Sequence, residues 1–283
     1  MKLGFIGLGK LGKAIAQRLS ESGYELTGWN RTVSKAEGLD IKLVASPKEV
    51  AEKTDIIFTC LFDSNAVSKV LTQQDGLLSG DLSGKTIIDL TTNHFKAVPA
   101  FHEQCAQAGA IYLESPVAGS VVPALQGALT ILVSGNKEAF MRVKPILDLL
   151  GKHIFFLETP GMATKMKLIN NLALGSFMAT LAEALAFGED IGLGKETILD
   201  ILSVGGGNSM VLNAKKGKLL TGDFSSHFSN ALIYKDLSIM QELAYELKKP
   251  LFAGAVLKET YARTFQKGFE NEDFSSVYKL FKP

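Results

Sequence analysis

The sequence predicts an α/β domain with a mostly parallel sheet, followed by an all-α domain that a long helix joins to it. In the first half of the chain, short runs rich in β-branched and aromatic residues alternate with amphipathic helical patterns, which is typical of a parallel sheet covered by helices. From Gly161 onward only helical patterns follow. We therefore expect one domain at residues 1–159 and another at residues 160–283.

The elements of the first domain follow one another in regular alternation. The expected strands are residues 2–6, 25–29, 56–61, 86–89, 111–114, 129–133 and 153–157. The expected helices between them are residues 13–22, 47–53, 66–71, 98–108 and 137–150. Such an order predicts crossover connections that place helices over a parallel sheet.

One long apolar segment opens the second domain. Residues 162–191 carry apolar side chains almost continuously, which predicts a single helix buried on most sides. At the standard rise, about 30 residues span roughly 45 Å, more than a small domain buries alone. We expect this helix to connect the domains and to contribute to the core of a homodimer or homotetramer. Further helices are expected at residues 195–204, 231–247 and 250–267.

Composition limits the kind of partner. With 46% hydrophobic residues among 283, the chain can fill a sizeable core. Thirty basic and 29 acidic side chains give a net charge of +1, which offers no electrostatic footprint for nucleic acid or an anionic membrane surface. No stretch is expected to supply the ~18–20 uninterrupted apolar residues that cross a bilayer. A small molecule is therefore the expected partner.

The cysteines and histidines favour a reducing compartment without a metal site. Cys60 and Cys105 lack CxxC spacing, so we expect two small buried hydrophobic residues and neither a disulfide nor a zinc site. The four histidines show no metal-ligand spacing and adjoin no triad-like arrangement. We expect a cytoplasmic protein that holds no metal.

Three glycines between the first strand and the first helix form a dinucleotide-binding fingerprint. Gly7 would allow the tight turn, Gly9 would let the backbone approach a pyrophosphate, and Gly12 would let the helix pack on the strand. The helix amino terminus adds N–H donors and a partial positive charge. The spacing alone also fits a plain glycine-rich turn, but its place in a strand–helix–strand unit favours a Rossmann-type domain. The expected contacts are Gly7, Leu8, Gly9, Lys10, Leu11 and Gly12.

The end of the second strand predicts which dinucleotide is bound. An acidic residue there would bind the ribose 2′-hydroxyl of NAD and repel a 2′-phosphate. The sequence instead has Asn30, Arg31 and Thr32, so a guanidinium and a hydroxyl are available to a phosphate. NADP(H) is therefore the expected cofactor. The alternative for Arg31 is a solvated loop residue.

Lys167 and Asn171 lie four residues apart and thus on one face of the long helix. A lysine and an asparagine that face inward need hydrogen-bonding partners. A polar substrate would provide them, and so would a buried structural network. The spacing alone leaves both readings open, because the lysine could also extend to the surface.

Several motifs, in order along the chain, resemble the β-hydroxyacid dehydrogenases, the group related to 6-phosphogluconate and 3-hydroxyisobutyrate dehydrogenases. They are the glycine fingerprint, DLTT at residues 89–92, SPVAGS at 115–120, the segment around Lys167, and KDL at 235–237. The resemblance spans essentially the whole chain. It implies an NADPH-dependent oxidoreductase that reduces a small aldehyde or keto acid to the hydroxy acid.

The resemblance also implies roles for individual residues. Lys167 would be the general acid that protonates the nascent alkoxide, as a lysine that is charged at neutral pH can do. The residues implied to bind substrate are Asn171, Gly119, Ser120, Phe228 and Asp236. The further residues implied to contact the cofactor are Leu61, Phe62, Asn65, Thr92 and Lys235.

The subgroup most similar in its SPVAGS segment is that of the glyoxylate and succinic semialdehyde reductases. One position departs from the family pattern: Ala118 stands where a serine usually meets the substrate carboxylate. Loss of a hydrogen bond to a charged group, typically ~1.5–3 kcal/mol, would weaken glyoxylate binding about tenfold or more unless another donor compensates. Ser120 or the backbone at Gly119 could supply that donor.

Three other functions stay open at this point. They are a 3-hydroxyisobutyrate-type or other hydroxy-acid dehydrogenase, an imine reductase, and a non-catalytic NADPH-binding protein. Lys167 with Asn171 disfavours the imine reductases, which do not normally place a lysine there. Retention of both halves of the chain favours an enzyme over a binding module.

Overall fold

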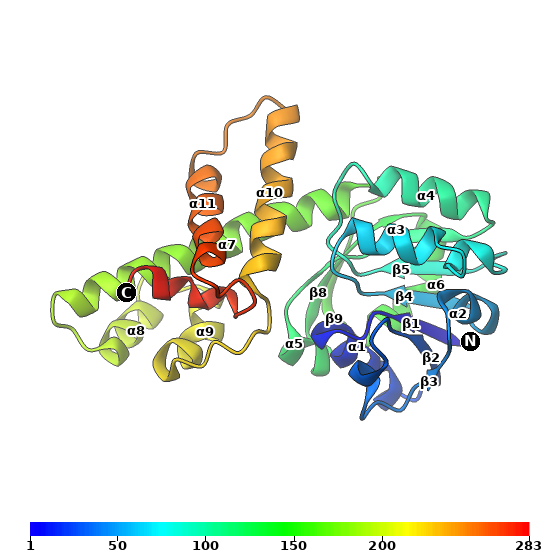
Figure 1. The fold of residues 1–283 in the computed structure, drawn as a ribbon, viewed down its shortest axis with the longest axis horizontal. Coiled ribbons are helices and arrows are strands. Elements are labelled where there is room, and N and C mark those ends of the chain that lie inside the picture. Colours follow the sequence, from blue (N-terminus) through cyan, green and yellow to red (C-terminus); the bar gives the residue numbers. More distant parts are fainter. Residues whose placement is uncertain (283) are drawn as a thin grey trace. The chain divides into compact units, whose positions relative to one another are not determined.

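The computed structural model describes residues 1–282. Its internal contacts divide the chain into two compact units, Met1–Lys167 and Leu168–Pro283. The predicted boundary at residue 159 precedes the long helix, whereas the contacts divide the chain inside that helix. Each unit is described by itself below, with element labels as in Figure 1.

The first unit is built on one mixed, mostly parallel sheet, as predicted. Its strand order is β3-β2-β1-β4-β5-β6-β8-β7, and β9 pairs with β8. All pairs from β3 to β6 are parallel, and so is β8 with β9, whereas β8 runs antiparallel to β6 and β7. The strands are β1 (Leu3–Ile6), β2 (Leu26–Trp29), β3 (Lys42–Leu43), β4 (Ile56–Thr59), β5 (Thr86–Asp89), β6 (Ile111–Glu114), β7 (Val117–Ala118), β8 (Leu129–Gly135) and β9 (Gly151–Phe156).

Helices cover both faces of this sheet and enclose two clusters of apolar side chains (Figure 1). They are α1 (Lys10–Glu21), α2 (Pro47–Lys53), α3 (Ser64–Thr72), α4 (Val98–Gln107), α5 (Val121–Leu125) and α6 (Lys137–Leu147). Side-chain caps fix several of the starts. In α2, for example, Ser46 accepts a hydrogen bond from the Glu49 N–H at 3.2 Å, and Pro47 occupies the first turn.

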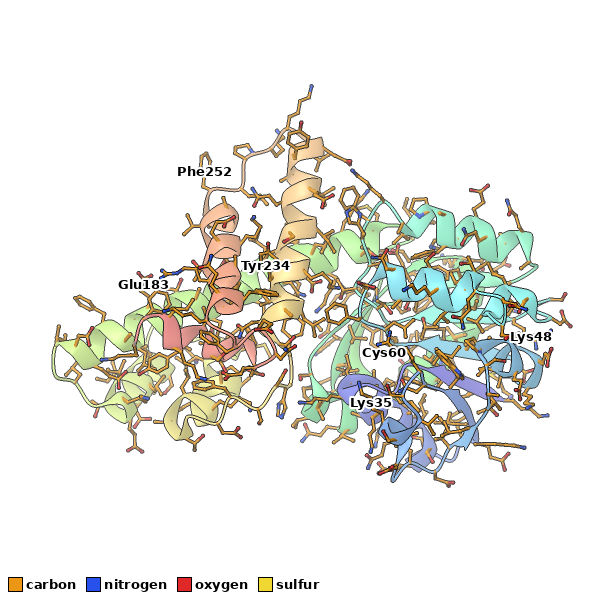
Figure 2. The ribbon with its side chains drawn as sticks, viewed as in Figure 1. Lys35, Lys48, Cys60, Glu183, Tyr234 and Phe252 are labelled. Carbon is orange, nitrogen blue, oxygen red and sulfur yellow. The ribbon has the colours of Figure 1, made fainter. Side chains whose placement is uncertain are left out.

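The second unit is helical, as predicted. It contains most of α7 (Met162–Asp190), then α8 (Lys195–Val204), α9 (Met210–Thr221), α10 (Asn230–Glu246), α11 (Phe252–Gln266) and a 3-10 helix at Phe274–Leu280. Its apolar core draws on all of these elements. Figure 2 shows Glu183 on α7, Tyr234 on α10 and Phe252 at the start of α11.

A buried ion pair organises the carboxyl-terminal part of the second unit. Lys215 of α9 lies 2.8 Å from the Asp273 carboxylate, and both side chains are buried. The same carboxylate accepts hydrogen bonds from the backbone N–H groups of His227 and Ser275 and from the Ser275 hydroxyl. It therefore joins α9, the segment before α10 and the 3-10 helix.

The long helix is less buried than the sequence suggested. A continuous stripe along α7 is exposed, and its spacing of three and four residues keeps it on one side of the helix. The large apolar residues of this stripe are Met162, Met166, Ile169, Phe177, Phe187 and, just past the helix end, Ile191. The prediction of burial on most sides is wrong for this side, because nothing within the described chain covers it.

The helix also corrects the expectation about apolar length. By length and composition α7 could cross a membrane, although 39% of its most apolar 18-residue window is buried in the fold. The expectation that no stretch would pass this test is wrong, because a few polar residues do not offset so many apolar ones. Core helices pass the same test, and α7 contributes Met178, Leu181 and Leu185 to the core of the second unit.

Candidate active site

The glycine turn after β1 has the geometry that a bound pyrophosphate requires. Gly7 has φ +97°, and a Cβ there would lie 2.3 Å from the Cys60 carbonyl oxygen. A Cβ on Gly12 would lie 2.0 Å from the Gly7 carbonyl oxygen, so the start of α1 packs directly on the turn. A Cβ on Gly9 would meet nothing within 4 Å. The open space at Gly9, beside a helix amino terminus that no side chain caps, fits a phosphate group.

This difference between glycines gives a testable separation of folding from binding. We expect Gly12→Ala to destabilise the protein by about 1–3 kcal/mol, because the methyl group would overlap backbone. Gly9→Ala should leave the thermal unfolding temperature close to that of the wild type but weaken NADPH binding about tenfold or more. Calorimetry and fluorescence titration with NADPH measure the two effects. Equal loss of stability in both variants would contradict the assignment of Gly9 to the phosphate.

The loop after β2 is connected to the glycine turn. The Asn30 side chain accepts a hydrogen bond from the Leu8 N–H at 2.8 Å and donates one to the Thr32 carbonyl at 2.7 Å. Asn30 therefore holds the two loops together, while Arg31 and Thr32 are exposed. A 3-10 turn follows at Val33–Ala36, and it brings a second cation, Lys35, into the same loop (Figure 2). No motif in the sequence predicts this place for Lys35.

Two further loops that were predicted to contact the cofactor are joined by hydrogen bonds. The Leu61 N–H donates to the Thr91 hydroxyl at 3.0 Å, and the Ser64 hydroxyl donates to the Asn93 side-chain oxygen at 3.0 Å. Phe62 in the first loop is 52% exposed. The structure thus places Leu61 and Phe62 in the loop after β4, Asn65 in the first turn of α3, which follows that loop, and Thr92 in the adjoining loop after β5.

A buried carboxylate, Asp89, anchors these loops. It ends β5 and accepts hydrogen bonds from the Thr59 hydroxyl at 2.7 Å, the Thr91 N–H at 3.0 Å, the Asn93 amide at 2.6 Å and the Tyr112 hydroxyl. Burial, together with the Asp89 charge, raises the pKa of Tyr112 well above its ordinary value, so this phenol remains a donor. Asp89 was noted only as part of a motif, because its partners come from three different strands or loops.

The turn that carries two predicted substrate residues has a backbone only glycine adopts easily. Gly119 has φ +121°, and a Cβ would approach the Leu129 side chain to 2.7 Å. Ala118 ends the short strand β7, and Ser120 is the residue before α5. Gly119 is exposed and the residues on each side of it are partly exposed, so the backbone here is accessible to a ligand.

Lys167, one turn into α7, is only 7% exposed. The start of α7 contacts β6 through Glu114, whose carboxylate accepts hydrogen bonds from the N–H groups of Gly161 and Thr164 and from the Thr164 hydroxyl. Burial raises the pKa of Glu114, although these hydrogen bonds act in the opposite direction. Lys165 is on a more exposed part of the helix.

The second unit holds the other predicted substrate residues, of which Asn171 and Asp236 are hydrogen-bonded to each other, whereas Phe228 makes a separate ring contact. The Asn171 amide, fully buried, donates to Asp236 at 2.5 Å, and the Lys235 ammonium lies 3.1 Å from the other oxygen of the same carboxylate. The partly buried Phe228 packs edge-on against Phe274 at 5.7 Å. Asn171, Lys235 and Asp236 are thus brought together, and the prediction that Lys235 reaches the cofactor remains a prediction.

The cysteines differ in exposure. Cys105 is buried, but Cys60 is only partly buried, because it lies at the open end of β4 (Figure 2). Both are free thiols, and burial raises the pKa of each to about 12. Neither is therefore a thiolate nucleophile at neutral pH.

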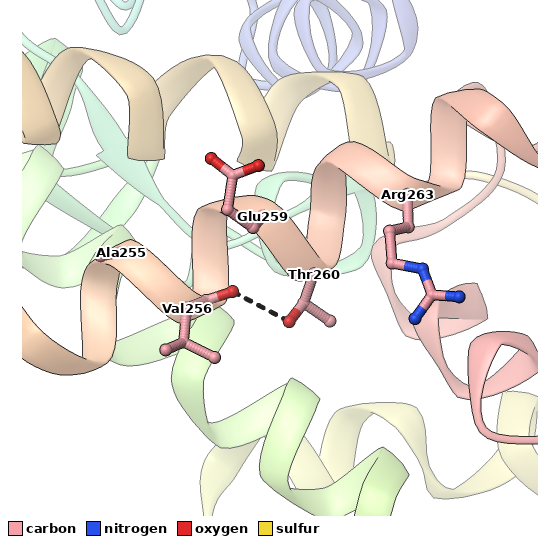
Figure 3. A pocket seen from close by; sticks show the side chains of 5 residues that line it. All are labelled: Ala255, Val256, Glu259, Thr260 and Arg263. Carbon is pink, nitrogen blue, oxygen red and sulfur yellow. Dashed lines mark hydrogen bonds between the residues drawn. The ribbon is translucent and has the colours of Figure 1, made fainter.

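A hollow on the surface of the second unit contains none of the predicted site residues. It is lined by Ala255, Val256, Glu259, Thr260 and Arg263, all from α11 (Figure 3). The Thr260 hydroxyl is already bonded to the Val256 carbonyl at 2.9 Å within the helix. One helix face of this kind does not provide the converging polar groups of an enzyme site. Among residues 1–282, no cluster of three metal-ligating side chains occurs.

Two family models match the chain and define its class. Residues 2–158 match the NAD binding domain of 6-phosphogluconate dehydrogenase, and residues 161–281 match a family model described as NAD-binding of NADP-dependent 3-hydroxyisobutyrate dehydrogenase. The fold and the glycine turn therefore belong to a dinucleotide-dependent oxidoreductase. The predicted cofactor, NADP(H), is confirmed at this level.

Similar proteins narrow the class to a family. The chain is 32% identical to glyoxylate/succinic semialdehyde reductase 2 of Arabidopsis thaliana, over 100% of this chain and 80% of that protein. It is 33% identical to 2-(hydroxymethyl)glutarate dehydrogenase of Eubacterium barkeri, over 100% of this chain and 95% of that protein. The chain belongs to the β-hydroxyacid dehydrogenase family, and its class of activity is that of an NADP-dependent hydroxyacid dehydrogenase.

Another group of relatives is longer. The chain is 34% identical to the cytokine-like nuclear factor N-PAC of Mus musculus, matching 99% of this chain but 51% of that protein.

Among solved structures, Psf3 in complex with NADP+ and 2-OPP has a TM-score of 0.91 at 28% identity, covering 98% of this chain and 99% of that one. The 3-hydroxyisobutyrate dehydrogenase of Salmonella typhimurium has a TM-score of 0.91 at 26% identity, covering 99% of each chain.

Proposed function

We propose that this protein uses NADPH to reduce a small aldehyde or keto acid, with glyoxylate and succinic semialdehyde as the first candidates, to the hydroxy acid. The observation that carries the proposal is the pair of buried polar residues on one face of α7. Lys167 is 7% exposed and Asn171 is fully buried, so an ammonium that can donate a proton and an amide that can donate a hydrogen bond share one face of the helix. The similarity to a glyoxylate/succinic semialdehyde reductase supports this choice of substrate.

The proposed reaction divides the chemistry between cofactor and protein. Bound NADPH supplies a hydride to the carbonyl carbon. The Lys167 ammonium donates a proton to the carbonyl oxygen as negative charge develops on it. Asn171 has a second amide N–H besides the one bonded to Asp236, and it donates this N–H to the substrate. Asp236 holds that amide in one orientation.

The preference for NADPH over NADH follows from the loop after β2. Arg31 and Lys35 give this exposed loop two cations, and no acidic residue stands at the end of β2. A 2′-phosphate would gain charge-assisted hydrogen bonds there, whereas a ribose hydroxyl would lack a carboxylate partner.

The substrate carboxylate would be held at the Gly119 turn. Ala118 lacks the hydroxyl that the family usually offers at this position, so the remaining donors are the Ser120 hydroxyl and the backbone of the Gly119 turn. The longer succinic semialdehyde places its carboxylate farther from the reacting carbon than glyoxylate does. We therefore expect that the missing hydroxyl at position 118 weakens the binding of glyoxylate more than the binding of succinic semialdehyde.

The test is NADPH oxidation by the purified protein with a panel of carbonyl compounds. Glyoxylate, succinic semialdehyde, methylglyoxal and tartronate semialdehyde are compared at equal concentration, with NADH in parallel. Turnover that is faster with NADPH than with NADH supports the proposal. The compound of the panel that is reduced fastest identifies the preferred substrate. Tight NADPH binding without turnover of any carbonyl or hydroxy acid would favour a non-catalytic binding protein, and turnover of cyclic imines alone would favour an imine reductase.

We also propose that the protein acts as a homodimer or homotetramer in the cytoplasm. The exposed apolar stripe of α7 supports assembly, because soluble proteins rarely leave such a stripe uncovered. Two free cysteines are consistent with a reducing compartment.

Assembly through α7 is checked by solution mass. The chain has a mass of 30.5 kDa, so light scattering should give about two or four times that value. Phe187→Asp, which places a charge in the stripe, should shift the mass towards that of one chain. Met141→Asp is the matched control, because Met141 of α6 is similarly exposed at 57% but lies outside the stripe. A wild-type mass of one chain would contradict the proposal.

A further inference from the structure

The first turn of α7 is fixed by side chains of the sheet. The first four N–H groups of a helix have no acceptor within the helix and need partners elsewhere. In α7 the Thr164 N–H donates to Glu114 at 3.2 Å and the Ala163 N–H donates to the Ser134 hydroxyl at 2.9 Å, and the N–H of Gly161, the residue before the helix, also donates to Glu114. The acceptors are the last residue of β6 and a residue near the end of β8.

Glu114 makes the larger contribution to this attachment. Its two carboxylate oxygens receive the Gly161 N–H, the Thr164 N–H and the Thr164 hydroxyl, and both Glu114 and Thr164 are fully buried. All these contacts lie inside the first unit. These hydrogen bonds hold the start of the helix at two residues, Gly161 and Thr164. They therefore restrict both the position of the helix and its rotation about its own axis.

The hydrogen bonds at the start of α7 also set the position of Lys167, because of its spacing from Thr164 along the helix. Thr164 and Lys167 are three residues apart, so they lie on neighbouring positions of one helix face, a single turn apart. Lys167 is also the last residue that the contacts assign to the first unit. Its position is therefore set relative to the sheet and the glycine turn by the hydrogen bonds of Glu114.

We propose that Glu114 is a positioning residue for Lys167, holding the first turn of α7 so that the Lys167 ammonium is in place for proton transfer. Glu114 is fully buried and both of its carboxylate oxygens accept hydrogen bonds from the start of α7, so the role assigned to it is to position Lys167 and not to react. The inference rests on the proposed function of Lys167. Since an error of about 1 Å in the position of a catalytic group can cost ~100-fold in rate, loosening this turn lowers kcat more than it affects cofactor binding.

Glutamine at position 114 tests the proposal with little change in shape. Whichever oxygen becomes an NH₂ group, that group faces at least one backbone N–H of the helix and leaves it without an acceptor. Glu114→Gln should lower kcat about 10–100-fold and leave the KM and the dissociation constant for NADPH within about twofold of wild type. Thr164→Val should lower kcat in the same direction, and Thr164→Ser, which keeps the hydroxyl, should restore it.

Asn136→Ala is the matched control. Asn136 follows β8 and caps α6 by accepting a hydrogen bond from the Ala139 N–H at 2.8 Å, but α6 carries no site residue. This variant should lose stability without losing kcat. If Glu114→Gln and Thr164→Val lower the unfolding temperature while kcat stays at the wild-type value, the positioning role is overturned.

A second readout does not depend on turnover. Acetic anhydride labels lysine amines, and peptide mass spectrometry gives the ratio of labelling at Lys167 to that at the neighbouring, more exposed Lys165. Glu114→Gln should raise this ratio at least twofold, whereas Asn136→Ala should not change it. An unchanged ratio in Glu114→Gln would overturn the inference. Absence of turnover in the wild-type protein would instead count against the proposed function, and the labelling ratio would still decide the role of Glu114.

Discussion

Lys167→Met should lower kcat for carbonyl reduction by about 10²–10⁴-fold, the usual contribution of a positioned general acid. Methionine keeps most of the volume of the buried side chain but has no proton to donate. The alkoxide would then have to take its proton from water. Because Lys167 is not expected to hold the cofactor, the dissociation constant for NADPH should change little.

Steady-state kinetics with the best substrate of the panel measures this effect. Lys165→Met is the control, because Lys165 is two residues away on a more exposed part of the same helix and should tolerate the change. A Lys167→Met enzyme that retains kcat within about tenfold of the wild type would show that another group protonates the product.

Lys215→Met should destabilise the protein by about 3–5 kcal/mol, because it leaves the buried Asp273 carboxylate without its cation. Asp273 is fully buried, and the Lys215 side chain is 9% exposed. The exposed pair of Lys144 on α6 and Asp148 just after that helix provides the comparison, since its side chains are 41% and 49% exposed. Lys144→Met should cost at most about 1 kcal/mol.

The pH dependence of this variant has a defined sign. Burial alone would raise the pKa of Asp273, but the Lys215 charge and the hydrogen bonds from Lys215, Ser275 and His227 hold it below the ordinary value of 3.8. The wild-type pair therefore contributes stability above that value and loses it as the pH falls through the folded pKa. Without Lys215, burial dominates and the folded pKa of Asp273 rises above 3.8. The variant should then gain stability as the pH falls from neutral.

Urea unfolding at pH 7 and pH 5 checks both statements. The difference in unfolding free energy between wild type and Lys215→Met should be largest at pH 7 and smaller at pH 5. A difference that grows towards pH 5 would mean that Asp273 does not remain the buried charge in the variant.

Local patterns predicted most of the regular elements. The helix Pro47–Lys53 was predicted with its exact bounds, because Pro47 marks the first turn and the apolar spacing is clear. The strands Thr86–Asp89 and Ile111–Glu114 were also exact. The two-residue strands β3 and β7 and the short helix α5 were missed, because they are too short to show a period.

Long-range partners account for the rest. The helix α9 was missed because Lys215, Lys216, Gly217 and Lys218 resemble a solvated loop. The burial of Lys215 depends on Asp273, which lies 58 residues away. In the same way, the contact between Glu114 and α7 joins residues 47 and 50 positions apart. Spacing within one segment reports on its own faces and not on the segment that will pack against it.

The division of the chain inside α7 limits where related proteins can be recombined. A junction at residue 159 would separate Glu114 and Ser134 from the helix turn whose N–H groups they accept. A chimaera joined there would have to recreate that fit with a foreign helix, whereas one joined after Lys167 would inherit it intact. The first four to six residues of α7 should therefore be kept together with the sheet in such chimaeras. Segments that change the substrate preference are most easily exchanged beyond them.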